Sequence, residues 1–171
     1  YGFSAYILGI DVEKGKKLIQ RLATHLEAMK GELPEERYCA YLASVYTYQL
    51  ALDKSQLMKY AKGIYNNIER AMELNPNDPF VLSMQGNVEF YSPFGSKKAA
   101  LEYFQKADSL YSVAGADYER WNRRAVQMTY IHCLNKQRRR DEAIALCAKL
   151  LAEEPNNVNF QQLLEELHAR D

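Results

Sequence analysis

The sequence has no surplus of charge of either sign and no long apolar run. Its 171 residues include 22 lysines and arginines and 22 aspartates and glutamates, so the formal net charge is zero. Proteins that bind nucleic acid usually carry a basic surplus or stripe, and the basic cluster here is only the short run 138–140. A stretch of about 18 apolar residues, which a membrane-spanning helix needs, does not occur. We therefore expect no nucleic-acid partner and no membrane span.

Cysteine and histidine are scarce, and their spacing offers no catalytic or metal site. The cysteines are too few for a disulfide framework and form no Cys-x-x-Cys pair: Cys39, Cys133 and Cys147. The histidines are far apart and provide no two ligands on one helix face: His25, His132 and His168. His132 and Cys133 are adjacent, but neighbouring helical residues do not face each other, so they form no nucleophile–base pair. The sequence predicts a protein that is not an enzyme and binds no metal or cofactor.

Apolar residues recur at three- and four-residue steps along most of the chain, which indicates helices, whereas the period-two pattern of strands is absent. One helix face carries Leu18, Leu22, Leu26 and Met29, and Gly31 follows as a stop signal. The predicted helices begin after side chains that can cap them: Asp11, Asp78, Ser96, Asp117 and Asn156 or Asn157.

One helical pattern occurs twice, in residues 97–107 and 141–156. Each copy begins with a small residue after a charged pair and then runs apolar at helical steps. The second copy ends in Glu-Pro-Asn, and residues 75–79 close an earlier helix in the same way. Such self-similarity predicts a stack of helical hairpins. We expect a single all-α domain over 1–171, an α–α superhelix with antiparallel hairpins at 1–31, 34–75, 78–113 and 117–154 and a capping helix at 157–170.

Residues 100–107 and 141–144 resemble the second helix of the tetratricopeptide repeat. Gly86 resembles the small residue of that repeat's first helix, which would pack against Ala100, and Pro155 resembles the closing proline. The Pro-Phe-Gly turn before residue 96 and the Trp-led helix that follows resemble a bacterial group of tetratricopeptide-like proteins, many of which are exported. The resemblance implies a solenoid of bacterial origin, with a weak preference for an exported or periplasmic location. The chain begins at Tyr1 without a methionine, which is typical of a processed protein or a trimmed fragment.

The resemblance also implies that the first helix of each hairpin lines a concave groove. The repeat phase places aromatic, amide and hydroxyl side chains there: Tyr41, Ser44, Tyr48, Ser83, Asn87, Phe90, Met128, His132 and Asn135. Such groups suit an extended peptide, because its backbone offers donors and acceptors while its side chains need apolar contact. The alternative is that they are only the surface of a scaffold. A carboxylate clamp does not fit, because Ser83 stands where a lysine is expected.

The predicted function is therefore non-enzymatic binding of a protein or peptide partner, or scaffolding of a complex, on the concave face. An alternative is self-association into a homo-oligomer through the Tyr-rich N-terminal helices. The N-terminal end carries Tyr1, Phe3, Tyr6 and Ile7, which are strongly apolar for a free end, and a broken helical stack must cover its exposed face.

Overall fold

The structure is a computed structural model that describes residue 4, residues 7–115 and residues 117–169. These residues form helices and connecting turns, and no strand occurs among them. The helices and one short 3-10 turn follow in chain order: α2 (Val12–Ala28), α3 (Glu35–Leu52), η1 (Lys54–Gln56), α4 (Leu57–Leu74), α5 (Pro79–Tyr91), α6 (Lys97–Ala114), α7 (Arg120–Lys136), α8 (Arg140–Glu153) and α9 (Val158–His168).

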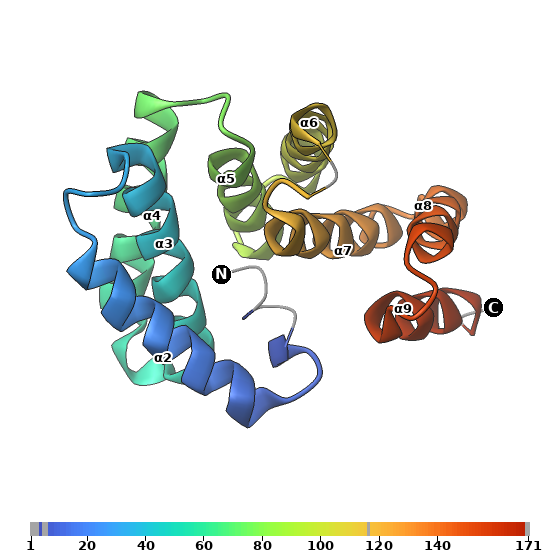
Figure 1. Cartoon of the computed structure of the whole chain (residues 1–171), viewed down its shortest axis with the longest axis horizontal. Helices are drawn as coiled ribbons and strands as arrows, with labels where there is room; N and C mark the ends of the chain where they lie inside the picture. Colours follow the sequence, from blue (N-terminus) through green and yellow to red (C-terminus); the bar gives the residue numbers. More distant parts are fainter. Residues whose placement is uncertain (1–3, 5–6, 116, 170–171) are drawn as a thin grey trace.

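The helices pair along the chain, and the pairs stack side by side. Helix α3 packs on α4, α5 on α6 and α7 on α8, while α2 contacts α3 and α9 contacts α8. The first helices of successive pairs also touch, α3 with α5 and α5 with α7. The pairs follow one another in an arc, with α2 to α4 at one end and α8 and α9 at the other (Figure 1). This arrangement confirms the predicted all-α class, an α–α superhelix of antiparallel hairpins.

Part of the segment before α2, in the first predicted hairpin, lies outside the described residues. Tyr1, Phe3 and Tyr6 lie outside the described residues, while Ile7 is half-buried. The predicted hairpin over 1–31 and the single-domain boundary of 1–171 therefore stay predictions.

Short polar side chains begin several of the helices, as the sequence predicts. Asp78 accepts hydrogen bonds from the backbone N–H groups of Phe80, at 2.8 Å, and Val81, at 3.0 Å, and Pro79 takes the first helical position of α5. Asp11 caps α2 through Lys14 N–H at 2.9 Å. Ser96 and Asn157 cap α6 and α9 in the same manner.

The start of α7 differs from the prediction that Asp117 caps it. Helix α7 begins at Arg120, and Glu119 precedes it in the left-handed conformation, with φ 43°. The Glu119 side chain makes no cap hydrogen bond, because it is engaged elsewhere: its carboxylate pairs with Arg37 of α3 at 2.6 Å. The side chain that precedes α7 is therefore held by a long-range ion pair and does not cap the helix.

Helices α5 and α6 approach each other closely at Gly86. A Cβ atom placed on Gly86 would lie 2.7 Å from Cε1 of Phe104, and its three nearest neighbours all belong to that ring. The sequence predicts Ala100 as the partner of Gly86. Ala100 is fully buried, but the residue in closest contact is Phe104, one helical turn further along α6. Only glycine leaves room for a buried aromatic ring at this crossing.

Candidate protein-binding groove

Three of the nine predicted groove residues point into the core. Ser44 and Ser83 are each 1% exposed, and their hydroxyl groups donate to backbone carbonyls of their own helices, at 2.8 Å and 2.7 Å. Phe90 is 8% exposed and packs edge-on against Phe104, with ring centroids 6.4 Å apart. These three side chains support the helices from within and offer almost no surface to a partner.

The other six predicted residues are half-buried and lie on the first helices of three successive hairpins. They are Tyr41 and Tyr48 on α3, Asn87 on α5, and Met128, His132 and Asn135 on α7. The three on α7 follow one another at steps of four and three residues, which places them on one face of the helix. Because α3 contacts α5 and α5 contacts α7, the three faces can form one continuous surface, which we call the inner face. Its use as a binding site stays a prediction.

Two exposed aromatic residues extend this surface and were missed by the sequence reasoning. Trp121 is 40% exposed and precedes Met128 by seven residues, so it lies on the same face of α7. Tyr91 directly follows Phe90 at the end of α5 and is 63% exposed, with the two rings in edge contact at 4.8 Å. Tyr91, and not Phe90, is therefore the aromatic side chain that this part of α5 presents to solvent.

Asn87 has unfilled hydrogen-bonding capacity. Its Oδ1 atom is buried and has no hydrogen-bond partner among the residues that the structure describes. Its Nδ2 group lies 4.0 Å from the sulfur of Met84, which is only a weak acceptor. A buried polar atom without a partner is costly, and native proteins keep few of them. An amide in this state gains a hydrogen bond if a peptide backbone reaches it.

A cluster of ion pairs around Arg37 links α3 to the starts of α5 and α7. The guanidinium of Arg37 donates to Asp78 at 2.5 Å, to Glu119 at 2.6 Å and to the Tyr118 hydroxyl at 3.2 Å. Tyr111 donates to the same Glu119 carboxylate at 3.2 Å. Burial opposes the charge of Arg37, but the two carboxylates outweigh this effect and raise its pKa above the usual range. The cluster joins α3, the start of α5 and the turn before α7.

A second cluster fixes α7 against its neighbours. Arg124 donates to Glu154 at 3.0 Å and to Gln127 at 2.5 Å, and Gln127 in turn donates to Asp108 of α6 at 2.7 Å. Burial pushes the pKa of Glu154 upward, but hydrogen bonds from Asn157 and Arg124 and the Arg124 charge together hold it below its usual value. The two clusters link α3, α5 and α7, which carry the inner face, to one another and to α6 and the end of α8.

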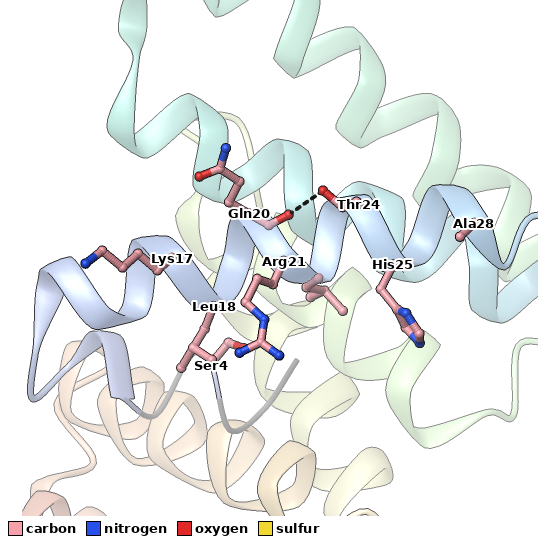
Figure 2. Close-up of a pocket in the computed structure, with 9 residues that line it drawn as sticks. Ser4, Lys17, Leu18, Gln20, Arg21, Thr24, His25 and Ala28 are labelled. Carbon is pink, nitrogen blue, oxygen red and sulfur yellow. Dashed lines mark hydrogen bonds between the residues drawn. The ribbon is translucent and has the colours of Figure 1, made fainter.

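A hollow bordered by described residues lies on α2. It has a volume of about 940 Å³, and its wall is mainly apolar, with Leu18, Leu22 and Ala28 among the lining residues. Leu18, Arg21 and His25 project to the same side of α2, the side on which Ser4 lies (Figure 2). A smaller hollow of about 100 Å³ lies between α7 and α9, and His132 and Asn135 both line it. The sequence reasoning missed the α2 hollow, because no repeat phase was assigned to this helix.

The described part of the chain contains no candidate metal site. No group of three or more His, Cys, Asp or Glu side chains within it is placed to hold a metal ion. Cys39, Cys133 and Cys147 are free and buried, and burial raises the pKa of the Cys147 thiol to about 11. None of the helices in residues 4, 7–115 and 117–169 is long and apolar enough to cross a membrane.

The described chain is thus an all-α helical-repeat protein. Among solved structures, it is similar to the assembly chaperone of RpL4 (Acl4), residues 1–338, with a TM-score of 0.55 and 14% sequence identity. The match covers 92% of this chain and 59% of that chain, so this chain spans well under two thirds of the chaperone's length. At this identity the similarity shows the shared fold alone. No protein-family model and no curated protein matches the sequence.

Proposed function

We propose that this chain binds a segment of another protein along its inner face and acts as a non-enzymatic binding or scaffold module. The observation that carries the proposal is the row of half-exposed aromatic, amide and thioether side chains on α3, α5 and α7, held in place by two buried ion clusters. Extended peptides are bound through this combination of backbone hydrogen bonds and apolar contacts. The similar fold of an assembly chaperone, a protein named for its action on another protein, supports the same class of function. Bacterial origin and export stay predictions.

The single tryptophan provides a direct assay. Trp121 is 40% exposed on the inner face, and it is the one tryptophan of the sequence. A peptide that covers it should shift its fluorescence emission to shorter wavelength. Peptides selected from a displayed random library supply the ligands, and fluorescence anisotropy of labelled copies gives their affinities.

The variant that tests the site is Asn87→Ala combined with His132→Ala. We expect its affinity to fall at least about fivefold, because a peptide group that loses its hydrogen-bond partner costs about 1 kcal/mol. The matched control combines Glu102→Ala and Lys149→Ala, which are exposed residues on the second helices α6 and α8. Peptides that bind the double variant and the control equally well, and leave Trp121 emission unchanged, would show that the inner face is not the binding site.

Self-association is the second candidate function. It is favoured by the exposed apolar side chains of Ile10 and Val12, each 53% exposed at the start of α2. Sedimentation velocity over a range of concentrations measures it directly. A monomer at all concentrations would eliminate this candidate and leave the peptide-binding proposal intact.

A further inference from the structure

We propose that the α2 hollow binds an acidic amphipathic helix of the partner protein. This inference rests on the proposed function and adds the chemistry of the bound segment. It depends on three properties of the hollow: its apolar floor, its basic rim, and the lack of an acidic partner for Lys17 and Arg21 among the residues that the structure describes.

The floor of the hollow suits one face of a helix. Leu18 and Leu22 are half-buried and stand one helical turn apart, and Ala28 continues the apolar wall. Two turns of α2 rise about 11 Å, which is also the length that two turns of a bound helix would cover. A partner helix with apolar residues at positions i, i+3 or i+4, and i+7 would place them against this floor.

The rim of the hollow is basic. Lys17, Arg21 and His25 stand at four-residue steps and so form one stripe beside the leucines. The lining residues that the structure describes include no aspartate or glutamate. Because the whole sequence has equal numbers of acidic and basic residues, this one-sided charge is a local property of the α2 face.

The two rim cations also lack acidic partners in the described part of the chain. No ion pair there involves Lys17 or Arg21, whereas Lys16, on the same helix, pairs with Glu13 at 2.7 Å. Several arginines elsewhere pair with carboxylates, for example Arg37 with Asp78 at 2.5 Å and Arg123 with Asp108 at 3.2 Å. Carboxylates of a bound helix would complete the pairing at the rim, while its apolar face filled the hollow.

The test uses synthetic helical peptides with the full chain. The first peptide carries leucines at helical spacing flanked by glutamates, the second has lysine in place of every glutamate, and the third has the acidic composition in scrambled order. Fluorescence anisotropy at low salt should show binding of the first peptide and at least about tenfold weaker binding of the other two. Raising the salt concentration should weaken the first complex, because exposed charge pairs are screened. Equal binding of the acidic peptide and its scrambled form would overturn the proposed apolar contact.

A charge reversal at the rim assigns the binding to this hollow. Lys17→Glu combined with Arg21→Glu should weaken binding of the acidic peptide at least about tenfold and improve binding of the lysine peptide. The control combines Lys14→Glu and Lys62→Glu, which change the net charge equally at exposed positions that do not line the hollow. If the control has the same effect as the rim variant, the attraction comes from net charge and the proposal fails.

Two further outcomes separate this inference from the proposed function. Library-selected peptides that depend on Asn87 and His132 but not on the rim would leave the inner-face proposal standing and remove this one. A dimer in sedimentation velocity that dissociates on charge reversal at the rim would show that a second copy of the chain, and no partner helix, occupies the hollow.

Discussion

Replacing Gly86 by alanine tests the contact that holds α5 against α6. The added Cβ would lie 2.7 Å from the Phe104 ring, and an ordinary contact begins at 3.4 Å, so the ring would have to withdraw by about 0.7 Å. Phe104 is fully buried and packs against Phe90, so it has little room to move. Overpacking of this kind costs about 1–3 kcal/mol. Alanine also stabilises a helix interior by about 0.5–1 kcal/mol relative to glycine. The expected net loss of unfolding free energy therefore lies between about 0 and 2.5 kcal/mol, centred on about 1 kcal/mol.

Urea denaturation measures this loss, and a second glycine provides the control. In Gly63→Ala the new Cβ would meet Tyr46 at 2.6 Å, nearly the same distance, but the Tyr46 ring is half-buried and can turn toward solvent. We expect a smaller loss there than at Gly86, with the denaturant slope unchanged in both variants.

A double-mutant cycle with Phe104→Leu then identifies the ring as the cause. The smaller side chain should relieve the clash, so the double variant should be more stable than the sum of the single effects by about 0.5–3 kcal/mol. If Gly86→Ala is stabilising, or if the two effects simply add, the close contact between α5 and the Phe104 ring is not as we describe it.

Three further predictions concern the buried charges and thiols. Arg37→Ala should lower the unfolding free energy by about 3–5 kcal/mol in urea titrations, because two mostly buried carboxylates lose their counter-charge; a loss below 1 kcal/mol would contradict the role assigned to the cluster. The lowered pKa of Glu154 means that its ionised form stabilises the folded state at neutral pH and that this contribution disappears as the pH falls from about 5 through the lowered pKa. The stability difference between the wild type and Glu154→Gln should therefore shrink on acidification, whereas a constant difference would place the pKa at its ordinary value. Titration without reductant should count three free thiols in denaturant, and a count of one would reveal a disulfide. In the folded state at pH 8 the thiols should react slowly with the reagent, because they are buried and burial raises the pKa of Cys147 to about 11.

The helices themselves could be predicted from the sequence because their signals are local. The start of α5 at Pro79 follows from Asp78, whose side chain can reach only the next few backbone N–H groups. The start of α7 could not be predicted in this way. Glu119 adopts its left-handed conformation while its carboxylate is held by Arg37, which lies 82 residues earlier in the chain. No local pattern around Glu119 contains that information.

The residues that face the groove were predicted less accurately than the helix starts. Sequence alone leaves the rotation of a helix about its own axis uncertain by about one residue. Phe90 and Tyr91 are adjacent aromatic residues, and either could be the one that faces solvent. Phe90 is buried because it meets Phe104, a contact between two helices that the sequence does not reveal. Ser44 and Ser83 look like surface residues, but a serine hydroxyl can bond to a carbonyl of its own helix and so be buried without an unfilled donor.

The Arg37 cluster has a consequence for how the chain unfolds. In most helical-repeat proteins each hairpin touches only its neighbours, so the array can fray from one end, unit by unit. Here Arg37 reaches past the α5–α6 pair to Glu119 at the entrance of the next hairpin, so three successive units share one cation. Unfolding of the first unit would leave the mostly buried carboxylates of Asp78 and Glu119, in the second and third units, without their counter-charge. Residues 35–136 should therefore melt as one cooperative block, whereas α9, which contacts mainly α8, lies outside this block.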